Sequence, residues 1–219
     1  MIAALFDLNG TLVDDMRLHG ELWRDAVREL GHEVPPERFY RDWAGWKSEE
    51  VLATIVGHAL PAETVRAIVE AKEARYREVY RTRVTEVSGA VAFLRRLRAA
   101  GTKVALATAA PALNRALVLE GLGITGDFDQ VVGPEGVKRG KPAPDIFLAT
   151  AAALDVAPER CVVFEDALNG IVAARAAGMR AVGIATAFSQ DELHGAGAEW
   201  AADDFRSLPA GLLALFGLA

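Results

Sequence analysis

Residues 2–12, with the sequence IAALFDLNGTL, constrain the fold more than any other stretch of the chain. The stretch begins as a short, uncharged apolar run, and that composition is typical of a strand buried on both faces, as in a parallel sheet. The run ends at Asp7, and Asn9 and Gly10 follow as turn residues that tolerate a positive φ. Ligands of open α/β sheets bind at the carboxyl ends of the strands. Asp7 is therefore the candidate nucleophile of a site at this strand end.

Two kinds of pattern follow this strand. Between residue 14 and about residue 85 the period is helical, and Gly and Pro separate four expected helices at 18–30, 36–43, 48–56 and 62–81, with Ser48 as a cap. Beyond residue 87, strands and helices are expected to alternate. We expect strands at 103–108, 130–132, 161–164, 180–184 and near Trp200, and helices at 89–100 (capped by Ser88), 114–120, 145–154, 171–177 and 212–216.

This alternation predicts βαβ units and an α/β fold with a parallel sheet. The helical block begins directly after the loop of the first strand, at the end of the sheet where Asp7 lies, and a block in that place is suited to act as a lid. We therefore expect a core of residues 1–14 and 86–219 and a helical cap of residues 15–85.

Composition narrows the classes of partner. The 219 residues are 52% hydrophobic and 25% charged, as is ordinary for a soluble globular protein, and the net charge of −6 disfavours nucleic acid and anionic membranes as main partners. No apolar run approaches the ~18 residues that span a bilayer, and the N-terminus lacks the features of a signal peptide. The single cysteine, Cys161, has no intrachain partner. We expect a cytoplasmic monomer or weak dimer.

Further polar side chains lie where strands end. Thr108 ends one expected strand, Glu165 and Asp166 follow another, and Lys141 lies in a loop between strand and helix. Because the ends of parallel strands face one side of a sheet, we expect these groups to meet Asp7. Each residue alone is more often a turn, capping or solvated residue, so the prediction depends on their joint placement.

Such a set of groups suits phosphoryl transfer. Several carboxylates together need a cation, and Mg²⁺, held by a few carboxylates, waters and substrate oxygens, meets that need. Lys141, Thr108 and the backbone N–H groups of the turn at Gly10 and Thr11 are suited to bind phosphoryl oxygens, since glycine allows close approach. Asp7 is then free to form an aspartyl-phosphate, with metal and lysine stabilising the transition state.

The ordered motifs resemble a known family. The segments DLNGTLVD (7–14), LAT (106–108), KPAPD (141–145) and FEDALNGI (164–171) are similar to those of the haloacid dehalogenase-like superfamily, in the branch with a helical cap that includes β-phosphoglucomutase and small phosphatases. The resemblance covers nearly the whole chain. It implies a Rossmann-like core, Asp7 as nucleophile, and a small phosphorylated metabolite as substrate.

The resemblance also implies a ligand set. Mg²⁺ would be bound by Asp7, the backbone carbonyl of Asn9 and Asp166, with Glu165 close by. Phosphate or substrate contacts are implied at strand and helix ends, from Thr108, Ala109, Asn114 and Lys141. In the cap, His19 matches a position of β-phosphoglucomutase, and residues 45–52 resemble its substrate-reading loop, where Lys47 or Ser48 falls near an arginine that grips the distal phosphate. Plain helix packing for His19 and a solvated side chain for Lys47 are the alternatives.

The sequence departs from the family pattern at position 9. The family has Asp-x-Asp, and its second Asp protonates the leaving group and later deprotonates water, whereas the amide of Asn9 has no proton to exchange. Loss of such a step typically costs about 10²–10⁴-fold in rate. The loss slows a reaction whose leaving group is a sugar alkoxide, because that group needs a proton. It has little effect on the reaction of an anhydride or an acyl phosphate. Phosphonoacetaldehyde hydrolase also lacks this Asp and forms a Schiff base with a cap lysine, for which Lys47 is the candidate here.

Three interpretations follow. The chain is an active Mg²⁺-dependent phosphatase that favours good leaving groups or uses another base, with Asp14, Asp15 and His19 as candidates. Alternatively, it is an ordinary phosphatase or a β-phosphoglucomutase-like sugar-phosphate mutase that has lost its acid, or it is an impaired protein that binds phosphometabolites without turnover. We take the phosphatase as the predicted function.

Overall fold

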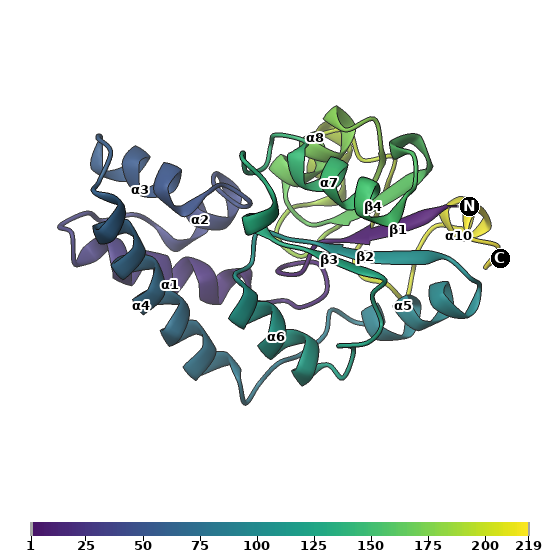
Figure 1. Cartoon of the computed structure of the whole chain (residues 1–219), viewed down its shortest axis with the longest axis horizontal. Coiled ribbons are helices and arrows are strands. Elements are labelled where there is room, and N and C mark those ends of the chain that lie inside the picture. The colour runs from purple at the N-terminus through teal and green to yellow at the C-terminus, as the bar shows by residue number, and fades with distance from the viewer. Residues whose placement is uncertain (1, 219) are drawn as a thin grey trace.

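A computed structural model describes residues 2–218, so the predicted core ends at residues 1 and 219 fall outside the described range. A six-stranded parallel sheet lies at its centre, with the strand order β3-β2-β1-β4-β5-β6 (Figure 1). The strands are β1 (Ala3–Phe6), β2 (Lys103–Ala107), β3 (Gln130–Val132), β4 (Cys161–Glu165), β5 (Arg180–Ile184) and β6 (Trp200–Ala202). The predicted α/β fold is confirmed, and every expected strand is present.

Both faces of the sheet are buried, as the apolar composition of β1 predicts. Side chains alternate across a strand, so Ala4 and Phe6 join one apolar cluster while Ala3 and Leu5 join the other. Helices α5 (Ala90–Ala99), α6 (Ala112–Gly121) and α10 (Ala210–Leu215) contribute to the first cluster. Helices α7 (Asp145–Leu154), α8 (Leu168–Ala176) and α9 (Gln190–Gly195) contribute to the second. The sheet is therefore the middle layer of three.

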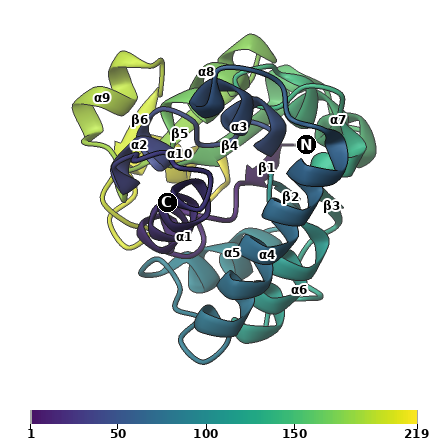
Figure 2. The same cartoon turned by 90° about the vertical axis from the view of Figure 1, so that its left-hand side faces the viewer.

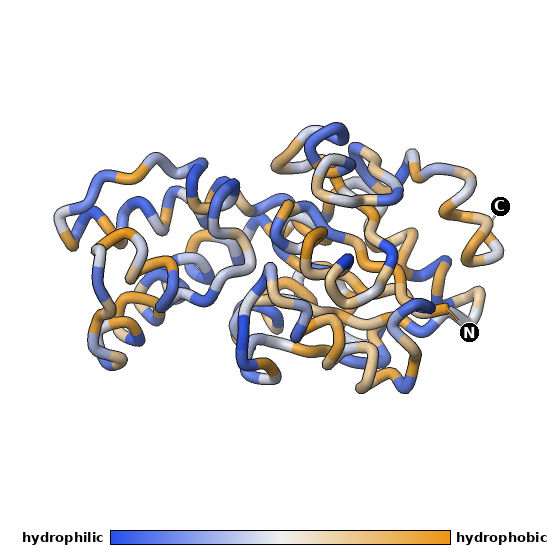
Figure 3. The backbone as a smooth tube through the Cα atoms, turned by 90° about the horizontal axis from the view of Figure 1, so that it is seen from above, coloured by the Kyte–Doolittle hydropathy of each residue, from blue (hydrophilic) through white to orange (hydrophobic). Residues whose placement is uncertain are grey.

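The remaining helices lie beyond the carboxyl end of the sheet. These are α1 (Met16–Arg28), α2 (Pro36–Arg41), α3 (Ser48–Val56) and α4 (Ala62–Tyr80), seen at the left of Figure 1 and facing the viewer in Figure 2. They have an apolar cluster of their own around Val27, Phe39 and Leu52. In Figure 3 their backbone alternates between apolar and polar colours, while long apolar stretches run through the part that holds the sheet. Within residues 2–218, no helix combines the length and the apolar character that crossing a membrane requires.

Some local predictions were wrong. Helix α9 was not expected, because it has six residues and only Leu193 of them is buried; its signal is the capping box of Ser189 and Glu192. Gly89, with a φ of 83°, precedes α5 in place of the expected cap Ser88, and Ser48 is the first residue of α3, with Lys47 before it. Helices α6 and α8 begin two and three residues earlier than predicted, and short 3₁₀ turns lie at Pro134–Gly136 and Pro158–Arg160.

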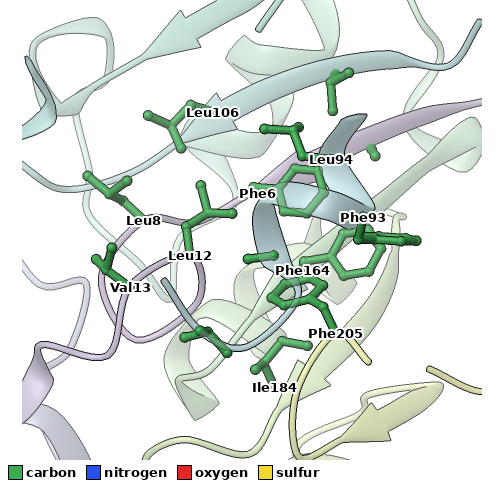
Figure 4. Close-up of a cluster of buried hydrophobic side chains, with 14 of the residues drawn as sticks. Phe6, Leu8, Leu12, Val13, Phe93, Leu94, Leu106, Phe164, Ile184 and Phe205 are labelled. Carbon is green, nitrogen blue, oxygen red and sulfur yellow. The ribbon is translucent and has the colours of Figure 1, made fainter. Parts of the chain in front are cut away.

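One cluster of aromatic rings joins the sheet to the helices on its first face (Figure 4). The ring of Phe93 on α5 lies 5.4 Å from that of Phe164 on β4 and 5.7 Å from that of Phe205. The rings of Phe6 and Phe164 stack at 4.7 Å. Phe93 therefore fills the space between neighbouring strands and the segment that follows β6.

We expect Phe93→Ala to lower the free energy of unfolding by about 3–5 kcal/mol, because it leaves a cavity in this cluster. Urea unfolding measures the change. Leu113→Ala is the control, since its side chain is 65% exposed and its removal should change stability by less than about 0.5 kcal/mol. A loss below about 1 kcal/mol for Phe93→Ala would contradict this account of the core.

Candidate active site

Asp7 lies directly after β1, at the carboxyl edge of the sheet. Its backbone N–H donates to the carbonyl of Phe164 at 3.0 Å, which ties the residue to β4. Thr108 follows β2, and its N–H donates to Val132 at 3.1 Å. Glu165 is the last residue of β4, and Asp166 follows it. The sheet therefore brings together side chains that lie far apart in the sequence, as predicted.

These side chains are buried around one cavity of about 130 Å³. Of the residues that the sequence singled out, its lining includes Asp7, Asn9, His19, Thr108, Ala109, Lys141, Glu165 and Asp166. Aromatic side chains of the helical segment 15–85 complete the wall, among them Trp23, Trp43 and Trp46. The strand ends and the helical segment thus enclose Asp7 together.

Lys141 connects two of the carboxylates. Its Nζ donates to Oδ1 of Asp7 at 2.9 Å and to Oε1 of Glu165, and the side chain is 3% exposed. Burial lowers the pKa of the ammonium, but the carboxylates of Asp7 and Glu165 outweigh burial and hold that pKa above its usual range. Lys141 is therefore a fixed positive charge beside Asp7.

Close backbone approach requires glycine at two places. Gly10 has a φ of 76°, and a Cβ there would lie 2.0 Å from Oδ2 of Asp166. Gly45, in the loop between α2 and α3, has a φ of 80°, and its Cβ would lie 2.8 Å from the Cβ of Lys141. The turn after β1 therefore packs on the carboxylate of Asp166, and the loop of the helical segment packs on the side chain of Lys141.

Three carboxylates form a possible cation site. Oxygen atoms of Asp7, Glu165 and Asp166 lie within 4.8 Å of one another, and among residues 2–218 only Lys141 is within ion-pair distance, pairing with Asp7 and Glu165. Oδ2 of Asp166 is buried without a partner among residues 2–218, while Oδ1 accepts from Thr11 at 3.2 Å. Burial, then Glu165 and Asp7, raise the pKa of Asp166 well above its usual value. These donors fit a hard dication, which would pair the orphaned oxygen.

Asn9 belongs to a second polar cluster, on the side of the helical segment. Its Nδ2 donates to Oδ2 of Asp15 at 2.6 Å and lies 3.2 Å from Nε2 of His19. The hydroxyl of Tyr76 donates to the same Asp15 oxygen at 2.6 Å. Asp15 is 2% exposed, and its Oδ1 has no partner among the described residues. An aspartate at position 9 would face this carboxylate, so the amide suits the site and a carboxylate does not.

Helix α4 supplies residues that the sequence analysis did not identify. Nζ of Lys72 lies 2.9 Å from Nδ1 of His19 and donates to Oε1 of Glu73 at 2.7 Å. Burial lowers the pKa of Lys72, against the opposite effect of Glu73. One pattern in the sequence could have indicated this cluster. Residues 15 and 19, and residues 72 and 76, have the i,i+4 spacing that places each pair on one helix face.

Four residues with predicted phosphate or substrate contacts lie outside the lining of this cavity: Gly10, Thr11, Lys47 and Asn114. The backbone N–H of Gly10 donates to the carbonyl of Val13 at 2.7 Å, and that of Thr11 donates to the carbonyl of Leu8 at 3.3 Å, so both already have acceptors. Asn114 is fully buried and joins α6 to α4, where its Nδ2 donates to Glu73 at 2.6 Å and its Oδ1 accepts from Arg77 at 2.8 Å. Nζ of Lys47 lies 3.4 Å from the carbonyl of Val137. The predicted contacts of Asn114 and Lys47 with substrate stay predictions.

Comparisons with known proteins agree with this geometry. The chain is 33% identical over 193 residues to β-phosphoglucomutase from Bacillus subtilis, covering 84% of this chain and 83% of that protein. It is 33% identical over 187 residues to the fructose-1-phosphate phosphatase YqaB from Escherichia coli, covering 82% and 94%. The structure of β-phosphoglucomutase from Clostridium difficile superposes with a TM-score of 0.85 at 26% identity, covering 99% and 98% of the two chains. Residues 1–178 match the haloacid dehalogenase-like hydrolase family, and the chain belongs to that family of enzymes.

Proposed function

We propose that this chain is a Mg²⁺-dependent phosphatase that transfers the phosphoryl group of a small phosphorylated metabolite to Asp7 and then to water. The observation that carries the proposal is the buried Asp7 at the end of β1, bonded to Lys141 beside Glu165 and Asp166 on a cavity wall. Relatives named as phosphatases of sugar phosphates support it. A cytoplasmic location and a monomeric or weakly dimeric state stay predictions.

The side chains divide the work of two displacements. An oxygen of Asp7 forms the bond to phosphorus while the bond to the leaving oxygen breaks, and in the second displacement a water oxygen replaces Asp7. Lys141 and Thr108, which line the cavity, are placed to hold the phosphoryl oxygens. Asp7, Asp166, the backbone carbonyl of Asn9 and the nearby Glu165 would hold Mg²⁺, which when bound offsets the charge of the carboxylates and of the phosphoryl group.

Asn9 determines which leaving groups suit the site. The amide has no titrating proton to give, so a group that departs as a stable anion, such as the carboxylate of an acyl phosphate, suits the site better than a sugar alkoxide. Of the three base candidates, His19 lines the cavity, whereas Asp14 and Asp15 do not. A sugar-phosphate mutase is the second candidate, favoured by the identity to β-phosphoglucomutase.

We propose that residues 15–85 form a cap over residues 1–14 and 86–219. The four helices have their own apolar cluster, and they contribute to the cavity wall opposite the strand ends. The hydrogen bonds of Asn114 with Glu73 and Arg77 join the two parts at one side.

We expect Asp7→Asn to lower Mg²⁺-dependent phosphate release from acetyl phosphate and p-nitrophenyl phosphate by at least ~10³-fold, because the nucleophile is lost. A colorimetric phosphate assay measures the rate. Asp155→Asn is the matched control, since Asp155 is exposed and its left-handed conformation, with a φ of 54°, suits asparagine. A wild-type protein that binds phosphate esters without releasing phosphate would instead be the impaired binder.

We expect Mg²⁺ to raise the Tm of the wild type and to leave the Tm of Asp166→Asn unchanged. Without metal, Asp166→Asn should be more stable by about 1 kcal/mol, which corresponds to a Tm about 2–4 °C higher, because a buried and unpaired carboxylate is removed. Differential scanning calorimetry with and without EDTA tests both points, with Asp155→Asn as control. An equal Mg²⁺ response in wild type and Asp166→Asn would refute this cation site.

The increase in Tm caused by Mg²⁺ should also depend on pH. The pKa of Asp166 is raised in the folded protein, so its contribution to stability is present below the ordinary carboxyl pKa of about 4 and is lost as the pH rises through the folded-state pKa. A bound cation would neutralise the Asp166 carboxylate in place of that proton. The increase in Tm caused by Mg²⁺ should therefore grow as the pH rises above about 4, and a constant increase across that range would contradict the assignment.

We expect Asn9→Asp alone to raise the rate on sugar phosphates by less than about 10-fold and to lower the Tm, because two carboxylates would then lie side by side. Asn9→Asp combined with Asp15→Ser should recover more of the ~10²–10⁴-fold step. The kcat on fructose 1-phosphate and glucose 6-phosphate measures this, and Asp15→Ser alone is the control. Equal gains from the single and the double variant would show that Asp15 does not restrict position 9.

A further inference from the structure

A second and larger cavity adjoins the first. Its volume is about 620 Å³, and it lies between segments 45–49 and 60–69 of the helical part and segment 134–141 of the core. The two cavities share six lining residues, namely Gly45, Trp46, Ser48, Ala109, Pro111 and Lys141. Since Lys141 also bonds Asp7 at 2.9 Å, the second cavity begins one side chain away from the nucleophile. Its volume is that of a pocket for a whole organic molecule.

The wall of this second cavity is mainly apolar. Aliphatic and proline side chains come from both parts of the molecule: Leu60, Val65, Val69, Pro111, Pro134, Val137 and Ile146. The segment after Thr108, with the sequence AAPA at 109–112, adds no polar side chain. Polar and charged residues also line the cavity, namely Lys47, Ser48, Glu49, Arg66, Glu135, Arg139 and Lys141. A flat apolar ring would bury its faces against the aliphatic part of the wall.

Two polar features of the lining bear on which ligand the cavity suits. The indole N–H of Trp46, which lines both cavities, is buried without an acceptor among residues 2–218. Lys47 and Arg66 have no carboxylate within ion-pair distance in the described chain, whereas Arg139 is paired with Asp145. Of the two carboxylates in the lining, Glu135 is paired with Arg115, and Glu49 has no ion-pair partner among residues 2–218, so the cations without a partner outnumber it by one. An acceptor on the ligand would satisfy the indole, and an anionic group would meet the unpaired cations.

We propose that the second cavity is the leaving-group subsite and that the substrate class is an aryl phosphate whose ring carries an anionic group. The inference rests on the proposed phosphatase function and names its substrate. Two independent observations meet in it: the apolar cavity suits a ring, and Asn9 suits a leaving group that needs no proton. A phenolate is such a group, because the ordinary pKa of a phenol is about 10.

The step balances without a further reactant. The bond between phosphorus and the aryl oxygen breaks as the bond from Asp7 to phosphorus forms, and the phenolate leaves with the electron pair. Water then forms the new bond to phosphorus, the bond to Asp7 breaks, and the proton of that water passes to solvent.

The test compares acetyl phosphate, phenyl phosphate, 2-naphthyl phosphate and 6-carboxy-2-naphthyl phosphate. The wild type should hydrolyse 2-naphthyl phosphate with a kcat/KM at least ~10-fold above that for phenyl phosphate, since the second ring enters the apolar cavity. Val69→Trp fills the cavity and should lower kcat/KM for 2-naphthyl phosphate by ~10-fold or more, while acetyl phosphate changes by less than ~2-fold. Val172→Trp on α8 is the control, because that side chain is 43% exposed and lines neither cavity. Arg66→Gln should raise KM for the carboxylated ring only.

Calorimetric titration of Asp7→Asn with 2-naphthyl phosphate tests the leaving-group subsite separately from the phosphatase function. Turnover of acetyl phosphate together with an unchanged naphthyl rate in Val69→Trp would overturn the subsite and leave the phosphatase standing. An inert wild type whose Asp7→Asn variant binds 2-naphthyl phosphate, with binding lost when Val69→Trp is added, would overturn the phosphatase and support the subsite. No turnover and no binding would overturn both.

Discussion

The ion pair of Lys141 with Asp7 and Glu165 holds the site together. One buried ammonium keeps two buried carboxylates in place at the ends of neighbouring strands, and these charges would otherwise repel one another in a medium that screens them poorly. Its charge does not suffice for Asp166, whose outer oxygen is left without a partner. The carboxylate that is placed to bind a cation is thus also one that destabilises the folded chain while its oxygen has no partner.

The sheet and the acidic site were predictable because their signals are local and periodic. Each strand is a short apolar run, and each functional group of the core follows the end of such a run, so parallel pairing alone brings Asp7, Thr108 and Asp166 together. Lys141 was predicted at this edge as a cation for phosphoryl oxygens, whereas its ion pairs with Asp7 and Glu165 were not predicted. Short elements such as α9 gave little apolar pattern and were missed.

The polar cluster around Asn9 was not predictable in the same way. It depends on how α1 and α4 cross, which brings Asp15, His19, Lys72 and Tyr76 to one point although the sequence shows only a polar helix face. The sequence did reveal that position 9 lacks the acid of the family. It did not reveal that a neighbouring carboxylate makes an amide the better partner there. Asn9, which departs from the family pattern, is thus matched to its partner Asp15.

The contact between Gly45 and Lys141 has a consequence for protein engineering. The loop of the helical segment packs directly against the side chain of Lys141, and this leaves no room for a side chain at position 45. A helical segment grafted from a relative to change specificity would have to bring a glycine at this point, or it would displace the lysine from Asp7. The two parts of the molecule are therefore not freely interchangeable modules.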